Sequence, residues 1–160
     1  MRKYLILFLL AFMQLQSFAA EVVVTVGTLA WGEKNELVIS MNNDAEVNGF
    51  QLDLALPDGF SFIDNGRGDV DPAVTERLKD LTVMCRKLPG GKYRIVVFSM
   101  SGKKIVSREG VIMRIPLAGN EGVSKGRYEV RVLNASASVS VDGKMESAKI
   151  ASSTSFIEVK

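Results

Sequence analysis

The chain has 160 residues, with 20 Lys and Arg against 18 Asp and Glu, one cysteine and no histidine. Arg2 and Lys3 account for the whole positive excess, so residues 20–160 are neutral and give no electrostatic reason to bind nucleic acid or an anionic membrane. Without histidine, the usual Ser-His-Asp and Cys-His forms of catalysis are excluded, together with most zinc and copper sites.

Residues 1–19 have the composition of a secretory signal peptide. The positive pair Arg2-Lys3 precedes the apolar run 4–13, which is too short to span a bilayer comfortably as a helix. Ser17-Phe18-Ala19 then supplies small residues at the first and third positions of a cleavage site after Ala19. We therefore expect a single secreted or periplasmic domain over residues 20–160.

Cys85 is the only cysteine, and it lies far from the expected cleavage site. No cysteine is therefore placed for lipid attachment at that site, and no disulfide can form within the chain. The run 81–85 is strand-like, and no histidine exists to activate the thiol. We interpret Cys85 as a small buried apolar residue.

Alternation of apolar and polar residues recurs along residues 20–160 and predicts short strands. The alternating stretches are 22–26, 37–41, 47–56, 60–62, 81–86, 93–100, 111–117, 128–132, 139–141, 145–150 and 156–159. Turn residues separate them, and no long helical period interrupts them. Nine or so short strands of this kind indicate an all-β fold, an antiparallel β-sandwich or barrel.

Residues 47–62 carry the clearest strand pattern. The even-numbered apolar residues from Phe50 to Leu56 fall on one side of an extended strand. Gln51 and Asp53 fall on the other side, which we expect to face water. Pro57-Asp58-Gly59 stops the strand, because proline lacks an N–H and glycine accepts positive φ.

Local signals also predict two hairpins and one short helix. Pro89-Gly90-Gly91 joins two strand patterns, and Asp142-Gly143 is typical of a type I′ turn, which needs positive φ at both central positions. A short helical excursion is expected near 71–79, with Asp71 as its cap and Pro72 in its first turn.

No residue set in the sequence indicates catalysis or a bound metal. Asp64, Asn65, Asp69 and Asp71 carry oxygen ligands, but they lack the EF-hand spacing and its terminal glutamate, so a solvated acidic loop is favoured over a calcium site. No spacing of carboxylates favours glycoside hydrolysis. We therefore expect a protein that is not an enzyme and needs no cofactor.

Aromatic residues offer one alternative site. Trp31 lies in the turn 30–32, outside the strand alternation, where an exposed ring is able to stack on the apolar face of a sugar. A row of exposed aromatics is not evident, and core packing accounts better for most of the others. A carbohydrate-binding module that uses Trp31 for stacking is therefore the second interpretation.

Three stretches resemble cohesin-like domains in the same order along the chain. Residues 47–62, VNGFQLDLALPDGFSF, resemble the early strand-turn of that family. Residues 93–101, YRIVVFSMS, and 109–117, EGVIMRIPL, resemble its later strands, and the glycine-led start at 126–128 fits the next one. The resemblance extends over most of residues 21–160.

The resemblance implies a nine-stranded jelly-roll sandwich of the carbohydrate-binding-module-like superfamily, common in secreted proteins of Bacteroides-type bacteria. Cohesins bind dockerins, which are small calcium-loaded helical pairs, and so assemble extracellular glycan-processing complexes. The family's binding residues do not map one to one, but Gln51 and Asp53 lie on the outward face of the strand that resembles the binding sheet. A secreted, non-catalytic module docking a dockerin-like protein is therefore expected, with direct binding of polysaccharide as the alternative.

Overall fold

The computed structural model describes residues 20–28, 35–152 and 155–160, and these are almost entirely strands and turns. The strands are β1 (Val22–Thr28), β2 (Glu36–Asn43), β3 (Glu46–Ala55), β4 (Phe60–Phe62), β5 (Asp69–Val70), β6 (Ala73–Val74), β7 (Thr82–Lys87), β8 (Lys92–Phe98), β9 (Val111–Gly119), β10 (Gly126–Val141), β11 (Lys144–Ser152) and β12 (Ser155–Val159). A single 3₁₀ turn, Glu76–Leu78, interrupts them. Within the described ranges, no helix is long and apolar enough to cross a membrane.

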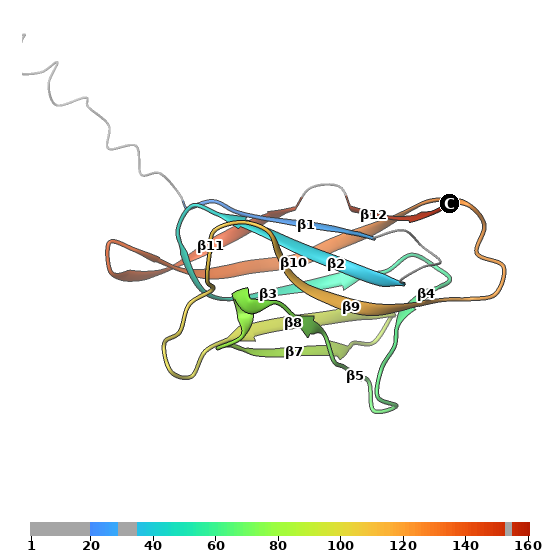
Figure 1. Ribbon diagram of the computed structural model, residues 1–160, viewed down its shortest axis with the longest axis horizontal. Coiled ribbons are helices and arrows are strands. Elements are labelled where there is room, and N and C mark those ends of the chain that lie inside the picture. Colours follow the sequence, from blue (N-terminus) through green and yellow to red (C-terminus); the bar gives the residue numbers. More distant parts are fainter. Residues whose placement is uncertain (1–19, 29–34, 153–154) are drawn as a thin grey trace, which may run out of the picture.

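The strands form two packed sheets that share β10, and β11 pairs with β10 of the second sheet and with β1 of the first. The first sheet runs β9–β2–β1–β12–β10, and the second runs β11–β10–β3–β8–β7–β5. In Figure 1, β1 and β2 of the first sheet lie above β8 and β7 of the second. The predicted all-β sandwich is confirmed.

The core lies between the two inner faces. Phe50, Leu52 and Leu54 of β3 are at most 4% exposed, as the alternation predicts. The largest fully buried side chains come from both sheets: Leu37, Ile39 and Met41 of β2, Ile112, Met113, Ile115 and Leu117 of β9, and Tyr93 and Ile95 of β8. Each such side chain stabilises the fold by roughly 1.5–3 kcal/mol before conformational entropy is subtracted.

One strand departs from the predicted antiparallel arrangement. β1 pairs antiparallel with β2 but parallel with β11, where Val22 lies beside Ile150, and parallel with β12, where Gly27 lies beside Phe156. The sequence could not indicate this, because side chains alternate with the same period in parallel and antiparallel strands. The first and last strands of the domain are therefore neighbours.

Both predicted hairpins are confirmed, but the start of the helix is wrong. Asp142 and Gly143 have φ of 49° and 76°, as a type I′ turn requires. Helical geometry begins at Glu76 rather than after Asp71, and Thr75 is the cap. The residue before a proline is biased towards extended backbone, and the residues after Pro72 pair with β9 as β6.

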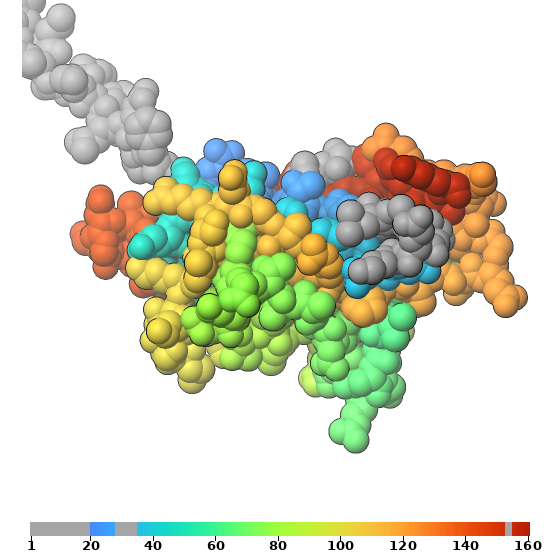
Figure 2. Space-filling view, viewed as in Figure 1, coloured from blue at the N-terminus to red at the C-terminus, as the bar shows by residue number. Residues whose placement is uncertain are grey.

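β10 is one strand of 16 residues where the alternation suggested two. Its first part pairs with β12, and from Arg131 onward it pairs with β3. A bulge separates Leu133 from Ser136 in that pairing, and Asn134 there has a positive φ of 48°. β10 thus passes from one sheet to the other, while the β10–β11 hairpin projects from one end of the molecule (Figure 2).

Cys85 is 3% exposed and packs in the core, as predicted. Burial raises the pKa of its thiol to about 12. The thiol therefore stays protonated at neutral pH and acts as a small apolar side chain.

Candidate functional site

The second sheet has one side away from the core, which we call the outer face. Strand register assigns to it Ser136 and Ser138 of β10, Gln51 and Asp53 of β3, Arg94, Val96 and Phe98 of β8, and Thr82, Met84 and Arg86 of β7. The outer face therefore presents side chains from four adjacent strands.

A row of paired charges crosses this face. Arg94 donates two hydrogen bonds to the Asp53 carboxylate, at 2.8 Å to Oδ1 and 2.9 Å to Oδ2, and Asn134 donates a third at 2.9 Å. Arg86, directly opposite Arg94, pairs with Asp69 at 2.8 Å. Each guanidinium thus has its own carboxylate, and the row as a whole carries no net charge.

Asp53 was expected to face water, and this expectation is wrong. It lies on the outer side of β3, but its side chain is only 2% exposed because Arg94 and Asn134 cover it. The hydrogen bonds from Arg94 hold the pKa of Asp53 below its ordinary value, against the opposing effect of burial. Asp53 therefore fixes the position of Arg94, whose side chain is 41% exposed.

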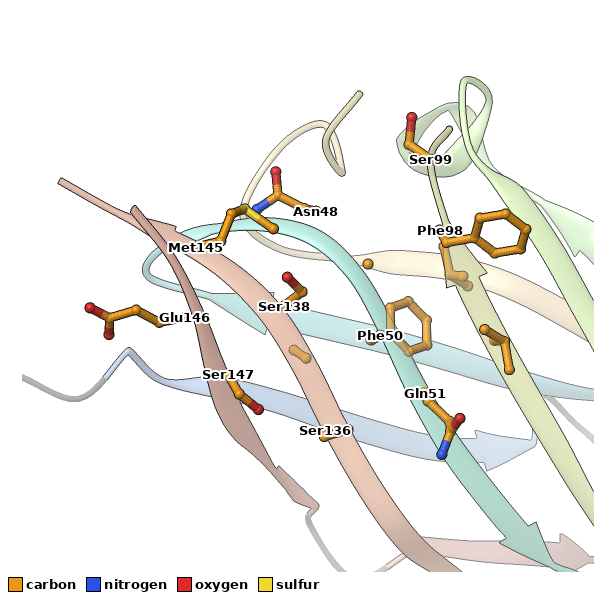
Figure 3. Close-up of a pocket in the computed structure, with 14 residues that line it drawn as sticks. Asn48, Phe50, Gln51, Phe98, Ser99, Ser136, Ser138, Met145, Glu146 and Ser147 are labelled. Carbon is orange, nitrogen blue, oxygen red and sulfur yellow. The ribbon is translucent and has the colours of Figure 1, made fainter. Parts of the chain in front are cut away.

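Gln51 is half-buried and lies at the edge of a shallow hollow over Gly49. Figure 3 shows the hollow between β11, β10, β3 and the end of β8. A Cβ on Gly49 would lie 2.5 Å from the carbonyl oxygen of Val97, so this position excludes every other residue unless the backbone shifts. Phe98, Ser138 and Met145 also line the hollow.

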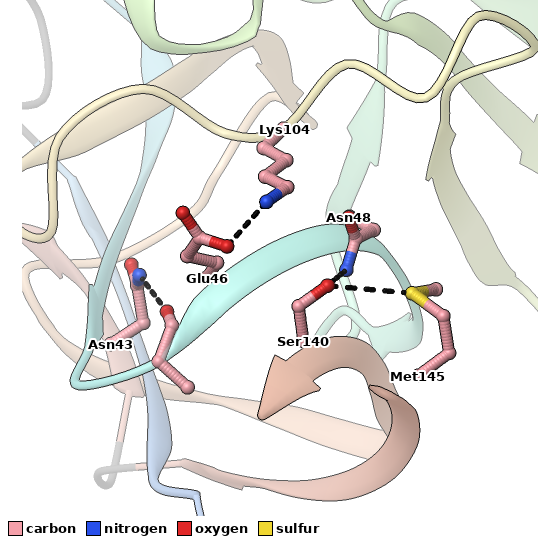
Figure 4. Close-up of polar contacts among 7 residues, drawn as sticks. Asn43, Glu46, Asn48, Lys104, Ser140 and Met145 are labelled. Carbon is pink, nitrogen blue, oxygen red and sulfur yellow. Dashed lines mark hydrogen bonds and ion pairs between the residues drawn. The ribbon is translucent and has the colours of Figure 1, made fainter. Parts of the chain in front are cut away.

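One rim of the hollow is held by polar contacts. Asn48 Nδ2 donates to Ser140 Oγ at 2.9 Å, and this hydroxyl in turn donates to Met145 Sδ at 3.5 Å (Figure 4). Glu46, at the start of β3, forms an ion pair with Lys104. The two hydrogen bonds connect β3, β10 and β11, and the ion pair connects β3 to the loop after β8. The Met145 side chain is still 62% exposed.

The outer face does not provide a platform of aromatic rings. Among the described residues that strand register assigns to it, Phe98 is the only aromatic one. Met84 is the prominent apolar residue, 51% exposed. Trp31, the predicted stacking residue, lies outside the described residues. The face is mixed, with apolar, hydroxyl and amide groups beside paired charges.

The acidic loop predicted at 64–71 uses oxygens of its side chains in contacts within the loop and with β7. Asp64 Oδ1 accepts from the backbone N–H of Gly66 at 2.7 Å, and Asn65 Oδ1 accepts from that of Arg67 at 3.0 Å. Asp69 pairs with Arg86. Across the part of the chain that the structure describes, no group of three or more His, Cys, Asp or Glu side chains is placed to hold a metal ion.

The sequence matches no protein-family model, and no curated protein matches it. Solved structures do match. The seventh ScaB type I cohesin of Pseudobacteroides cellulosolvens is 20% identical and has a TM-score of 0.65, with 89% of this chain and 92% of that chain covered. A non-cellulosomal cohesin from the archaeon Archaeoglobus fulgidus is 10% identical, with a TM-score of 0.62 over 89% and 91% of the two chains. The domain has a cohesin-like fold.

A further cohesin-like neighbour comes from a complex with a dockerin. It belongs to a type I cohesin–dockerin complex from Clostridium thermocellum and is 10% identical, with a TM-score of 0.61 over 89% of this chain and 99% of that one. At these identities the similarity establishes the fold, and individual residues do not transfer.

Three residues at or beside the outer face escaped the sequence analysis: Gly49, Arg94 and Asn134. Gly49 had a usable signal, because a glycine within a strand often marks a bulge or a close backbone approach. Arg94 and Asn134 had none, because they lie 41 and 81 residues from Asp53 in the chain and meet it only through strand register.

Proposed function

We propose that this domain is a non-catalytic docking module that binds a dockerin-like protein through the outer face of its second sheet. The observation that carries the proposal is the mixed character of that face, in which the charges are paired and exposed apolar groups lie beside hydroxyl and amide groups. Protein interfaces typically combine such groups, with unpaired charges depleted at their centre. Cohesin-like neighbours solved with dockerins, from Clostridium thermocellum and Acetivibrio cellulolyticus, support it.

In this proposal Gln51 and Asp53 have different roles. Gln51 lines the hollow and contacts the partner directly. Asp53 contributes indirectly, because its carboxylate holds the Arg94 guanidinium in one orientation. A preorganised guanidinium loses less conformational freedom on binding than a free one.

Direct polysaccharide binding is the weaker alternative. Sugar-binding surfaces of sandwich domains present coplanar rings, and Phe98 alone supplies a ring to the described outer face. The alternative depends on Trp31 and is tested by Trp31→Ala.

We also propose that residues 1–19 direct secretion and are removed. The apolar run after Arg2-Lys3 and the small residues before Ala20 support this. Amino-terminal sequencing of the protein from its natural host should begin at Ala20. A chain that still begins at Met1 would contradict the proposal.

The deciding experiment is capture of a partner on immobilised residues 20–160, from proteins secreted by the host, with calcium and with a chelator. Mass spectrometry should identify a protein with paired calcium loops that is retained only with calcium, and its purified form should bind in calorimetry. Binding to a glycan array that is lost in Trp31→Ala, with no protein retained, would favour the alternative.

A pair of variants identifies the face that is used. Met84→Lys introduces a charge on the outer face, whereas Val74→Lys introduces the same charge at a position of similar exposure on β6, 44% against 51%. Met84→Lys should weaken binding of the purified partner about tenfold or more, and Val74→Lys should leave it unchanged. Equal effects of the two variants would contradict use of the outer face.

A further inference from the structure

β11 has a free edge along the first part of its length. On one side, residues 144–149 pair with β10, whereas on the other side β1 pairs with β11 only from Ile150 onward. An open groove remains between the start of β1 and residues 146–149. In the part of the chain that the structure describes, no backbone hydrogen bond reaches this edge between Lys144 and Ala148. A strand edge of this kind is a template for pairing with another strand.

The geometry of the hairpin determines which backbone groups the free edge presents. With its two-residue turn, the β10–β11 hairpin begins with a hydrogen-bonded pair, and such pairs alternate with non-hydrogen-bonded ones along an antiparallel ladder. Lys144 and Glu146 therefore direct their N–H and C=O groups towards β10. Met145 and Ser147 direct theirs outward, where a second strand can pair with them.

The charges beside this edge are complementary to themselves. Lys144 and Glu146 are exposed and lie on the same side of β11, two positions apart. Among the described residues, neither side chain has an ion-pair partner. An antiparallel second copy whose Met145 lies opposite Met145 brings its Glu146 opposite Lys144, and its Lys144 opposite Glu146. Opposite charges directly across a strand pair stabilise the pair, and like charges destabilise it.

The neighbouring registers are unfavourable. In a twofold dimer of this kind, one residue of the strand lies opposite itself at the axis. An axis at Lys144 or at Glu146 places two like charges opposite each other. An axis at Ser147 brings the turn of the second copy against the start of β1, which lies beside Ile150. Met145 is therefore the central residue that both charge and space allow.

We infer that two copies of this chain pair antiparallel through the free edge of β11, with Met145 of each copy at the twofold axis. The two Met145 residues exchange backbone N–H···O=C hydrogen bonds, and a Lys144–Glu146 ion pair between the copies lies on either side of them. The hairpin projects from one end of the molecule, so the rest of each copy lies beyond the turn of the other (Figure 2).

This pairing determines how the two outer faces are arranged. The twofold axis is perpendicular to the sheet, so the second sheets of the two copies form one continuous sheet with both outer faces on the same side. The contact involves few residues, and we therefore expect a weak dimer that forms at high protein concentration. The inference does not depend on what the outer face binds.

Cross-linking at single positions tests the register. In Met145→Cys the two new thiols lie across a hydrogen-bonded pair, whose Cα atoms are about 5.5 Å apart and within reach of a disulfide. Oxidised glutathione should convert this variant to a covalent dimer about tenfold faster than Ser147→Cys, which has an equally accessible thiol on the same edge. Cys85 is buried and should not react. Equal rates for the two variants, or no covalent dimer, would overturn the inference.

Charge reversal tests the ion pairs. In NMR spectra of residues 20–160, the amide signals of residues 144–147 should shift between dilute samples and samples of about millimolar concentration. Lys144→Glu alone and Glu146→Lys alone should each lose these shifts, because like charges then face each other. An equal mixture of the two variants should recover them, because opposite charges face each other again.

Lys149→Glu is the matched control for net charge. It changes the charge of the chain by the same amount as Lys144→Glu, on the same strand but outside the proposed contact, so it should shift with concentration as the parent protein does. Parent signals that do not depend on concentration would overturn the inference. So would a mixture of Lys144→Glu and Glu146→Lys that behaves as its two components do alone.

Discussion

Arg77 is the least ordinary residue of the core, a guanidinium 7% exposed with no carboxylate bonded to it. All its donors are used by oxygens of β2 and of the loop before β9: the carbonyl groups of Met41, Val106, Ser107 and Gly110, and the side chain of Asn43. Burial lowers the pKa of Arg77, but the group stays charged because its ordinary value is so high. One side chain thus bridges β2 and this loop, beside the backbone hydrogen bonds that Met41 and Asn43 donate to Gly110 and Arg108.

Arg77→Lys should therefore destabilise the domain by roughly 3 kcal/mol, because an ammonium cannot reach five acceptors arranged around a planar fork. Urea unfolding at neutral pH measures the change. Lys79→Ala is the control, because it removes the exposed pair with Glu76 and should leave stability unchanged. Equal stabilities of Arg77→Lys and the parent protein would show that the fork geometry is unimportant.

Asp53 makes part of the stability depend on pH. Arg94 lowers its pKa, so the charged carboxylate stabilises the folded state above the pKa of an aspartate in the unfolded chain, about 3.9. This contribution disappears as the pH falls through the lowered value. Asp53→Asn should cost about 1 kcal/mol at pH 7, a modest figure because solvent reaches Arg94, and the difference from the parent should shrink towards pH 3.

Unfolding measured at both pH values checks this, with Asp58→Asn in the exposed turn after β3 as the control for removal of a carboxylate. A difference between parent and Asp53→Asn that stays constant from pH 7 to pH 3 would mean that the ion pair does not stabilise the fold.

At the scale of the strand, the β3–β8 pair depends on Gly49. Gly49→Ala should destabilise the domain by about 1–3 kcal/mol, because the new Cβ must push β3 from β8. Gly27→Ala in β1 is a matched control, since a Cβ there has no atom of the described residues within 4 Å. Thermal unfolding of both variants tests the contrast, and a Gly49→Ala variant as stable as Gly27→Ala would refute the close approach.

The strands themselves were largely predictable, because burial of one sheet face imposes its period on the sequence. The alternation from Phe50 to Leu54 predicted which side of β3 faces the core, and Asp142-Gly143 predicted the turn between β10 and β11. Contacts between side chains far apart in the sequence were not predictable. The sequence alone indicates that Asp53 is exposed to solvent, whereas strand pairing places Arg94 of β8 beside it and buries it. The crossing of β10 between sheets was also hidden, because it depends on the backbone conformation of Asn134 and leaves the alternation on either side intact.

Over the whole molecule, residues 20–160 hold two buried and three exposed methionines. Met41 and Met113 have no exposed surface, whereas Met84, Met100 and Met145 are 51%, 89% and 62% exposed. Two of the exposed three belong to the outer face or its hollow, Met84 on β7 and Met145 on β11. Methionine is the adaptable apolar side chain of binding surfaces, and the proposed docking face uses it in this way.

Mild hydrogen peroxide should oxidise Met84, Met100 and Met145 to sulfoxides and spare the two buried methionines, as peptide mass spectrometry will show. The oxidised protein should stay folded, because the core is untouched, and should bind the purified partner more weakly. Methionine sulfoxide reductases should restore binding. Oxidation of Met41 or Met113 as fast as that of Met84 would contradict the buried placement of these residues.

The parallel contacts of β1 with β11 and β12 also determine how the domain responds to mechanical force. A pull on the start of β1 and the end of β12 acts in opposite directions along neighbouring parallel strands. The load is then shared by the hydrogen bonds of β1 with β11, β12 and β2, which must slide and break together. An antiparallel terminal pair would instead open one bond at a time, so this topology suits a module that transmits tension.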